Sequence, residues 1–499
     1  MGIIQKDAVR TMLISYAGLF LGYLNKGVLF ILILSTEEIG LINLLLSLGL
    51  LFAQLSNLGT VNSLLRFFPY FRDEKKHHHG FPQLTILIAG VGIIISAMLS
   101  VFFYDEIVRY YSQKSPLFVA FYFWVIPIGI SHLLFLLLET YLKGIFKNVF
   151  AVFVKEILQR VFVTVSLFLY WFDWMTLDIF IAFNSLLYVL PFLILLWYTL
   201  RHGELSKWNA KITIPKRFRK IIVGYSLYNY VNSLGAVFIL TMDAMMIAAF
   251  LGLEATGVYT TVLYLASALQ VPYRSLMRVA VPLVPIYWKE RKMAAMEKLY
   301  KDISSINLVV SAFLFLLVWV NIDELFTLLP QEFATGIWVF LFIMIGRTID
   351  MYFGLNGFIL LNSKRYSIDI LFTLILLVIV FVLNYMLIPI YGIVGAAIST
   401  MTGLIVYNSL RLFYLLYHYK LHPFKLKNLL VFVLFGLTVF VDYSLPEIFD
   451  NWLLRVIQNT LVAGLLFVLP AYLLKVDNMV NDYFHKVLRI IGLKVNSKD

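Results

Sequence analysis

Long apolar runs separated by short polar segments are the dominant pattern of this sequence. A helix that crosses a bilayer needs about 20 mostly apolar residues. Dividing the chain at its polar interruptions predicts the spans 11–34, 41–65, 82–103, 118–140, 152–172, 179–199, 221–250, 257–287, 304–320, 334–361, 367–388, 393–417, 428–445 and 453–474. The pattern therefore predicts an all-α polytopic membrane protein with 14 transmembrane helices.

Three of these spans, 221–250, 257–287 and 334–361, are longer than a bilayer requires, so we expect them to tilt or kink. Pro272, Pro282 and Pro285 lie in the eighth span, 257–287. Proline removes a helical hydrogen bond and clashes with the preceding turn, so kinks are predicted there.

Basic residues are distributed unequally between alternate connections. With the N-terminus placed inside, the inside connections contain 31 of the 40 Lys and Arg residues, and the outside connections contain two, Arg109 and Lys114. Cytoplasmic loops carry such an excess, so the distribution supports the fourteen spans and predicts that both termini are cytoplasmic. The net charge of +12 then faces anionic lipid headgroups, and we expect no nucleic-acid partner.

Composition narrows the function classes further. The chain is 61% hydrophobic and 14% charged, which is typical of a membrane protein, and it has no cysteine for disulfides, thiolate nucleophiles or Cys-ligated metals. Three adjacent histidines, at 77–79, do not share a helix face, and no second cluster of metal ligands is evident. We expect a solvated loop there, and neither a metal site nor a cofactor. The first apolar segment lacks a small-residue cleavage site, so it is interpreted as a retained span.

A short repeat divides the predicted bundle. "TEEIGLINLLLSLG" (36–49) aligns with "LEATGVYTTVLYLA" (253–266) at an offset of 217 residues, which places Gly40 on Gly257. Six spans separate the two stretches, so the repeat is parallel and predicts two pseudo-symmetric six-helix lobes. The predicted parts are an N-terminal lobe (1–200), a basic cytoplasmic linker (201–220), a C-terminal lobe (221–417), and two further spans with a cytoplasmic tail (418–499).

Four stretches, spread from the first span to the twelfth, resemble one family. They are "LNKGVLFILILSTEEIGLINLLLSL", "SLLRFFPYFRDEKK", "TMDAMMIAAFLGLEATGVYTTVLYLASAL" and "YGIVGAAISTMTGLIVYNSLRLFYL". They are similar to the polysaccharide and O-antigen flippases of the multidrug/oligosaccharidyl-lipid/polysaccharide (MOP) exporter superfamily.

The resemblance implies a flippase, not an enzyme, located in the inner membrane. Its lobes would rock to translocate an undecaprenyl-pyrophosphate-linked oligosaccharide, such as an O-antigen or capsule repeat unit. The implied partners are this substrate, membrane lipids and other polysaccharide-assembly proteins, and the implied oligomeric state is a monomer.

Charged residues within the predicted spans are candidates for the substrate site, because a charge at bilayer depth costs roughly 2.5–3.5 kcal/mol. Lys26 lies near the middle of the first span, where it either attracts pyrophosphate in a central cleft or pairs with a buried acid. Arg274 and Arg278 lie one turn apart in the eighth span, and either both line the cleft or Arg278 extends to the surface. The resemblance implies a basic residue in the first span and arginines from the eighth.

Four further residues complete the candidate set. Arg347 and Asp350 lie one turn apart in the tenth span, as an internal ion pair or as cleft residues. Asp243, which the 217-residue offset aligns with Lys26, is a candidate for ion pairing or for coupling to an ion gradient. Arg66 is either an ordinary cytoplasmic basic residue or the first contact for a lipid phosphate.

Three alternative functions are open. A cation-coupled multidrug exporter of the same superfamily is disfavoured by the net basic candidate cleft, and a lipid II flippase is a narrower relative. A membrane-embedded glycan polymerase would need a sizeable external loop, whereas the longest outside connection, 104–117, has fourteen residues. The energy source, whether a proton gradient, a sodium gradient or the membrane potential, is left open.

Overall fold

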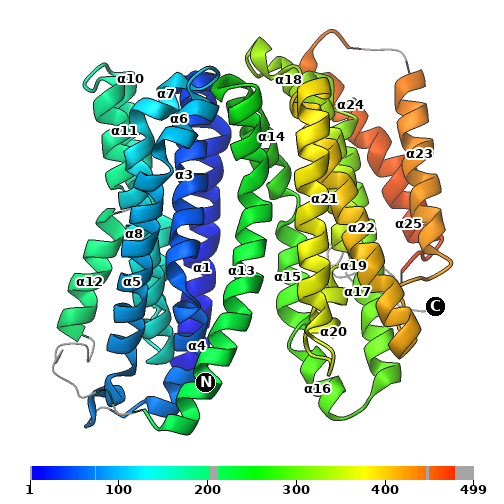
Figure 1. Ribbon diagram of the computed structural model, residues 1–499. Coiled ribbons are helices and arrows are strands. Elements are labelled where there is room, and N and C mark those ends of the chain that lie inside the picture. The colour runs from blue at the N-terminus through cyan, green and yellow to red at the C-terminus, as the bar shows by residue number, and fades with distance from the viewer. Residues whose placement is uncertain are drawn as a thin grey trace. The chain divides into compact units, whose positions relative to one another are not determined.

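The computed structural model describes residues 3–73, 75–187, 189–202, 212, 214–445, 449–477 and 481. Within these ranges the chain forms helices joined by turns and contains no strand, which confirms the predicted all-α class (Figure 1). The chain divides into two compact units, Met1–Thr261 and Val262–Asp499. Each unit is described separately below.

Unit 1 consists of long helices interrupted by short ones. They are α1 (Ile3–Leu24), η1 (Asn25–Leu29), α2 (Phe30–Ile33), α3 (Thr36–Asn57), α4 (Thr60–Phe71), η2 (His77–Gly80), α5 (Phe81–Phe102), α6 (Tyr104–Tyr111), α7 (Pro116–Phe121), η3 (Tyr122–Trp124), α8 (Val125–Gly144), α9 (Val149–Phe153), η4 (Val154–Leu158), α10 (Gln159–Trp171), α11 (Leu177–Leu186), α12 (Val189–His202), α13 (Lys216–Phe250) and the first part of α14 (Leu253–Ala268).

Unit 2 begins within α14 and continues to the C-terminus. Its other helices are α15 (Val271–Ala280), α16 (Leu283–Lys289), α17 (Met293–Trp319), α18 (Ile322–Thr327), η5 (Gln331–Phe333), α19 (Gly336–Phe353), α20 (Leu355–Leu361), α21 (Ile368–Tyr391), α22 (Ile393–Tyr419), α23 (Asn428–Ser444), α24 (Trp452–Ala463), η6 (Gly464–Val468) and α25 (Leu469–Leu473).

Eleven helical segments of the described chain are long and apolar enough to cross a membrane, so the protein is a multi-pass membrane protein. The other three predicted spans are also helical, but each departs from a plain apolar helix. The stretch 149–171 carries Lys155, Glu156 and Arg160, the stretch 253–289 is broken into three helices, and Asn428–Ser444 has 17 residues. The count of 14 stays a prediction.

Two of the three long predicted spans are broken, whereas the third, 221–250, lies within the continuous helix α13. The eighth span breaks after Ala268, and Pro272 lies in the first turn of the next helix, α15. It breaks again at Pro282, which precedes α16. The tenth span is interrupted at Gly354, between α19 and α20. The expected kinks at Pro272 and Pro282 are therefore present.

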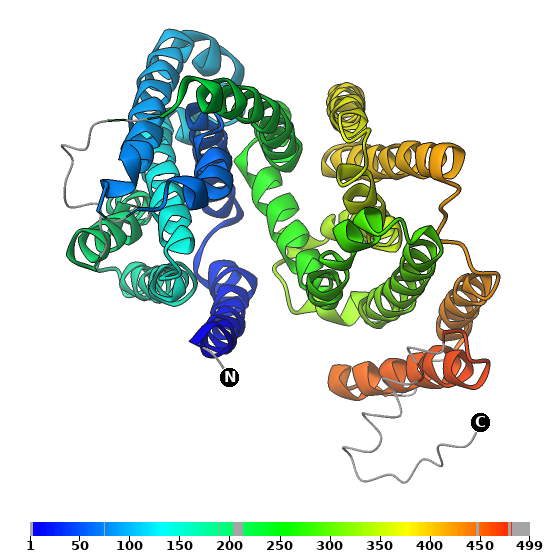
Figure 2. The same cartoon turned by 90° about the horizontal axis from the view of Figure 1, so that it is seen from below.

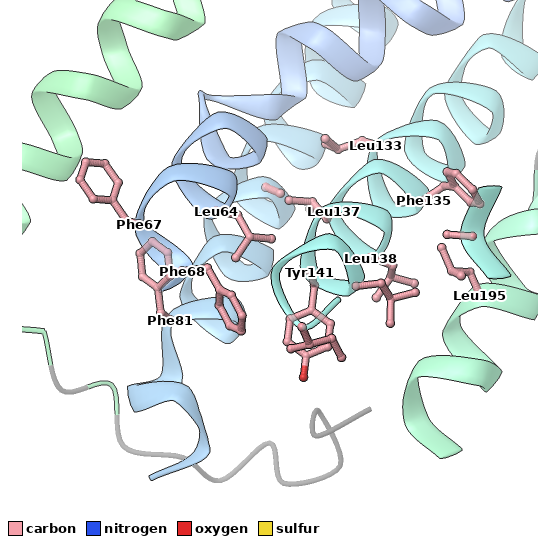
Figure 3. Close-up of a cluster of buried hydrophobic side chains, with 14 of the residues drawn as sticks. Leu64, Phe67, Phe68, Phe81, Leu133, Phe135, Leu137, Leu138, Tyr141 and Leu195 are labelled. Carbon is pink, nitrogen blue, oxygen red and sulfur yellow. The ribbon is translucent and has the colours of Figure 1, made fainter. Parts of the chain in front are cut away.

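A core of unit 1 lies among α4, α5 and α8. Figure 3 shows Phe68 and Tyr141 pointing toward one another, and their ring centroids are 5.4 Å apart with an edge-on geometry. Both side chains are at most 1% exposed. Burial of aromatic side chains of this size contributes strongly to packing.

The outer helix faces are apolar and exposed, as a lipid-facing surface requires. Val91, Ile94 and Met98 on α5 are 53%, 60% and 68% exposed. Figure 2, a view from below, shows the last helices of unit 2, α24 and α25, at the edge of that unit. Half of the predicted basic linker, 203–211 and 213, and most of the predicted tail, 478–480 and 482–499, lie outside the described residues. The predicted lobe boundaries stay predictions.

Candidate functional site

Lys26 lies in a single π turn, η1, inside the first span. One extra residue in such a turn displaces the side chains from their regular helical positions, and π turns occur frequently at functional sites. The neighbouring Asn25 fixes this turn against α10, because its Nδ2 donates to the Arg160 carbonyl (2.8 Å) and its Oδ1 accepts from the Thr164 hydroxyl (2.7 Å). The hydrogen bonds of Asn25 to α10 thus fix the turn that carries Lys26.

The Lys26 ammonium donates to Oδ1 of Asn43 on α3 (3.0 Å). The Asn43 amide in turn donates to the Thr260 hydroxyl on α14 (3.1 Å). Lys26 also borders a hollow of about 440 Å³ inside unit 1, whose other walls come from α2, α3, α8, α10 and α11. A cation therefore lies on the wall of a partly open hollow of unit 1.

Asp243 occupies the position 217 residues after Lys26. It lies on α13, is 6% exposed, and accepts a hydrogen bond from the Tyr259 hydroxyl on α14 (2.5 Å). The two residues thus contact equivalent helices of the predicted repeat, since Lys26 bonds to α3 and Asp243 to α14.

The two copies of the repeat cross near the first turns of α3 and α14. A Cβ atom on Gly40 would collide with the Leu253 carbonyl, and a Cβ atom on Gly257 would collide with the Thr36 carbonyl. The contact is reciprocal, and the Asn43–Thr260 hydrogen bond also joins residues 217 apart. Residues close to a two-fold axis meet their own equivalents, so this crossing fits a parallel repeat, whereas the division into two six-helix lobes stays a prediction.

Unit 2 brings two of the predicted arginines together. Arg274 on α15 and Arg347 on α19 lie on either side of the carboxamide of Gln270, which is 7% exposed. Nη2 of Arg274 is 3.5 Å from one terminal atom of the amide, and Nη1 and Nε of Arg347 are each 3.2 Å from the other. The amide has one oxygen, so it can accept from one guanidinium or from the other but not from both.

The carboxylates nearby are engaged elsewhere. Asp350 accepts from the Asn408 amide (3.0 Å), and Asn408 accepts from Asn356 (3.0 Å). Asp350 therefore does not form the internal ion pair with Arg347 that was one of its two interpretations. Within the described part of the chain, no carboxylate oxygen lies within 4.0 Å of the guanidinium nitrogens of Arg274 or Arg347. We call Arg274, Arg347 and Gln270 the arginine pair site.

A second arginine of unit 2 is neutralised, by contrast. Arg411 on α22 forms a two-pronged contact with Asp369 on α21, through Nε (2.8 Å) and Nη2 (2.7 Å) to Oδ1 and through Nη2 to Oδ2 (3.0 Å). Its guanidinium also lies over the Tyr407 ring, 3.9 Å from the centroid. The sequence interpretation missed this pair, although both charges fall within predicted spans.

The two remaining candidates are exposed, as Arg274 also is. Arg278 is exposed, one turn after Arg274 on α15. Arg66 on α4 is exposed and stacks over the Tyr225 ring of α13, 4.2 Å from the centroid. Neither position decides between a role in substrate binding and an ordinary surface role.

One expectation about the histidine run is wrong. His78 is 2% exposed, and its ring packs against Phe68 and Tyr141, with centroids 5.0 and 6.0 Å apart. The loop folds back onto the aromatic core, because left-handed backbone at His78 and His79 reverses the chain. No group of three or more His, Asp or Glu side chains with metal-site geometry occurs among the described residues.

Gln270, Asn43 and Asp369 are the polar residues that the sequence interpretation overlooked. Gln270 precedes Arg274 by one helical turn in an otherwise apolar stretch, and Asn43 lies within the second span. A polar residue at bilayer depth is the signal that identifies all three.

Comparisons with known proteins identify the family of the chain and its fold. The family model described as "Polysaccharide biosynthesis protein" matches residues 5–288. No curated protein sequence gives a significant match.

The fold is similar to those of solved membrane transporters. Lipid II flippase MurJ, in an inward closed conformation, is 14% identical with a TM-score of 0.74, over 94% of this chain and 100% of that chain. An inward-facing multidrug resistance MATE family transporter of the MOP superfamily is 15% identical, with a TM-score of 0.57 over 79% of this chain and 93% of that chain. A MOP superfamily transporter from Pyrococcus furiosus is 13% identical, with a TM-score of 0.51 over 83% and 95% of the two chains. At these identities the similarity establishes the fold.

Proposed function

Because the chain belongs to the polysaccharide biosynthesis protein family and has the fold of MOP superfamily transporters, we propose that it translocates a lipid-linked oligosaccharide. Transport across a membrane follows from the family and the fold. The proposal concerns the substrate, a polyprenyl-pyrophosphate-linked repeat unit of an O-antigen, capsule or exopolysaccharide, and the inner membrane as its location.

The observation that carries this proposal is the arginine pair site. Two guanidinium groups flank one neutral amide, while the acids around them are bonded to other groups. Arginine presents several donors in a planar fork that matches phosphate oxygens. A pyrophosphate would satisfy both guanidinium groups at once, which the single oxygen of Gln270 cannot do.

Charge also distinguishes this proposal from a multidrug exporter of cationic substrates. At an effective dielectric of about 20, two unit charges 4 Å apart interact by about 4 kcal/mol. The site would attract an anion and repel a cation by energies of this order. A lipid II flippase is the second candidate, because its substrate has the same pyrophosphate, and the fold similarity to MurJ favours it. The sugar part of the substrate would distinguish the two.

In the proposed cycle, the lobes alternate between inward and outward access while the hydrocarbon tail of the substrate stays in the bilayer. The arginine pair neutralises the pyrophosphate, and Lys26 provides a third cation in unit 1. Arg66 and Arg278 are proposed to guide the headgroup from the cytoplasmic surface. Asp243 and Asp350 are the candidates for coupling to an ion gradient.

The test is complementation of a strain that lacks its own flippase of this family, read out as surface polysaccharide. We expect Arg274→Gln and Arg347→Gln each to lower export at least tenfold at equal protein level, whereas Arg274→Lys retains part of it. Arg109→Gln is the matched control, because Arg109 is 72% exposed and pairs with Glu106 in the short helix α6 (3.2 Å). Normal export by the Arg274→Gln/Arg347→Gln double variant would refute the proposal.

A further inference from the structure

The Asp350 carboxylate is within one helical turn of Arg347 but is bonded to a different helix. The two residues lie three positions apart on α19, a spacing that favours an ion pair. The carboxylate instead accepts from Nδ2 of Asn408 on α22 (3.0 Å), and Arg347 lies beside the amide of Gln270. Asn408 and Arg347 are therefore alternative partners of one carboxylate.

The Asn408 amide is fixed in the orientation that binds Asp350. Its Nδ2 also donates to the Leu404 carbonyl (3.0 Å), and its Oδ1 accepts from Nδ2 of Asn356 (3.0 Å). Turning the amide over would point its oxygen at the Leu404 carbonyl and the Asp350 carboxylate, which are both acceptors. Asn408 and Asn356 are 1% and 0% exposed, so bulk water does not compete for these bonds.

Close helix packing holds α22 alongside α19 at this point. Gly346, the residue before Arg347, faces α22 so closely that a Cβ atom there would lie 3.0 Å from the Cα atom of Met401. Met401 precedes Asn408 by two turns on α22. The close approach of the two backbones therefore keeps Asn408 within reach of Asp350.

A second cation near Asn408 is already neutralised. Arg411 follows Asn408 by one turn on α22, but its guanidinium is bonded to both carboxylate oxygens of Asp369. If the bond between Asn408 and Asp350 is broken, Arg347 is the cation on the same helix that is left for the carboxylate.

We propose that Asn408 is a positioning residue, which holds the Asp350 carboxylate away from Arg347 and thereby keeps the arginine pair site available to pyrophosphate. This inference rests on the proposed function and deepens it, because it names a residue that controls the affinity of the same site. Breaking the Asn408–Asp350 bond turns Asp350 into an internal anion that competes with the substrate for Arg347. A movement of α22 along α19 would therefore lower the affinity of the site and release the pyrophosphate.

The first experiment measures the affinity of inorganic pyrophosphate for the full chain in nanodiscs of phosphatidylcholine. We expect Asn408→Leu to weaken binding at least tenfold. The double variant Asn408→Leu/Asp350→Asn should regain at least the wild-type affinity, because the competing anion has been removed. Weak binding by Asn408→Leu that Asp350→Asn does not restore would leave Asn408 a structural role only and overturn the inference.

Asn321→Leu is the matched control for the loss of a buried asparagine. Asn321 is 3% exposed and donates to the Leu317 carbonyl (2.8 Å) and the Thr460 hydroxyl (3.4 Å), so it bonds to no acid. We expect this variant to lower the unfolding temperature and to leave the affinity for pyrophosphate unchanged. An equal loss of affinity in Asn321→Leu and Asn408→Leu would overturn the inference, because it would show a general effect of stability.

A second experiment needs no ligand and so separates this inference from the proposed function. The unfolding temperatures of Arg347→Gln, Asp350→Asn and their combination are compared in the wild-type and Asn408→Leu backgrounds. We expect additive shifts in the wild type, where the two side chains form no ion pair, and non-additive shifts with Asn408→Leu, where they pair. Asn408→Thr, whose hydroxyl can bond to the Leu404 carbonyl one turn earlier, is the alternative background if the leucine variant does not fold.

The two experiments together assign each failure to one proposal. Additive shifts in every background would overturn the role of Asn408, whatever the protein transports. Non-additive shifts with Asn408→Leu, combined with no binding of pyrophosphate by the wild type, would support the role of Asn408 in holding Asp350 and contradict the proposed substrate.

Discussion

Two kinds of arginine occur within unit 2, and their surroundings assign them different roles. Arg411 is bonded to Asp369 through two nitrogens and covered by Tyr407, so its charge is used within the fold. Arg274 and Arg347 share a neutral amide instead. An arginine whose partner is an acid therefore has a structural charge, whereas one whose partner is a neutral amide has a charge that is available to a substrate.

Converting the shared amide to an acid tests this distinction. Gln270→Glu would place a carboxylate between Arg274 and Arg347, so we expect export to fall at least tenfold because the internal anion competes with the pyrophosphate. The same change should raise the thermal unfolding temperature, since it neutralises two cations. Gln270→Met is the control: it keeps both charges available, and we expect it to retain export. Full export by a stabilised Gln270→Glu protein would contradict an anionic substrate at this site.

Removing the acid of the Arg411–Asp369 pair should lower the unfolding temperature, whereas Gln270→Glu should raise it. Asp369→Asn leaves the Arg411 guanidinium, which is 14% exposed, without its counter-charge. Breaking a buried pair from one side costs about 3–5 kcal/mol. We expect a marked drop in unfolding temperature, measured in detergent, with a smaller loss in the double variant Asp369→Leu/Arg411→Met. An unchanged unfolding temperature for Asp369→Asn would show that this pair does not stabilise the fold.

At this scale the sequence predicted which charges lie within the apolar segments but not their partners. Lys26, Arg274 and Arg347 stand out because a charge in an apolar run is costly. Their neighbours Asn43 and Gln270 are 17 and 77 residues away from Lys26 and Arg347, respectively. Only the packing of the helices brings those side chains together, and spacing along one helix does not predict it.

Helices as elements were more predictable than their interruptions. Hydropathy placed a span at 41–65, whereas the structure has α3 to Asn57, left-handed backbone at Leu58 and Gly59, and then α4. The start of α3 could be recognised from the sequence, because Ser35 and Glu38 form a capping box. The π turn at Asn25–Leu29 has no comparable signature, since its stabilising contacts come from α10.

The crossing of α3 and α14 can be tested at Gly40. Gly40→Ala would place a methyl group against the Leu253 carbonyl, so the helices must separate at an apolar interface. Overpacking of this kind costs about 1–3 kcal/mol, and we expect a lower unfolding temperature and reduced export. Gly90→Ala on α5 is the matched control, because a Cβ atom there meets nothing within 4 Å. Since alanine favours helix over glycine by about 1 kcal/mol, the control should be neutral or stabilising. Equal stability of the two variants would contradict a tight crossing.

On the scale of the whole molecule, the chain beyond the repeat is attached through an ion cluster of Asp302, Lys425 and Asp477. Lys425, which precedes α23, donates to Asp302 on α17 and to Asp477 after α25, each at 2.8 Å. Partial burial disfavours the charged ammonium, but the hydrogen bonds and charges of Asp302 and Asp477 outweigh it and raise the pKa of Lys425. Unit 2 is thereby joined to its last helices by three charges.

This attachment predicts a stability difference that depends on pH. A lysine whose pKa is higher in the folded state stabilises the fold fully below its unfolded pKa, about 10.4, and loses that contribution as the pH rises through the folded pKa. We therefore expect Lys425→Gln to unfold at a lower temperature than the wild type by a constant amount from pH 7 to pH 9. The difference should shrink above about pH 10.4. A difference that stays constant at high pH would exclude the charge of Lys425 as its cause.

The all-helical class and the multi-pass character were predictable because the bilayer imposes a length and a composition on each span. The proposed preference for an anionic substrate could be predicted only in part. The sequence supplied a net basic set of membrane charges, but the exclusion of Asp350 from the arginine pair site required the Asn408 contact. The hollow beside Lys26 involves five helices of unit 1 and has no signature in any one of them.

The central claim is that Arg274 and Arg347 bind the pyrophosphate of a lipid-linked sugar. Its most direct test is the equilibrium affinity of purified protein for a polyprenyl-pyrophosphate-linked saccharide, compared with the Arg274→Gln/Arg347→Gln double variant. We predict tight binding by the wild type, weakened at least a hundredfold in the double variant and strongly dependent on salt. Equal affinities, or preferential binding of a lipophilic cation by the wild type, would contradict the claim.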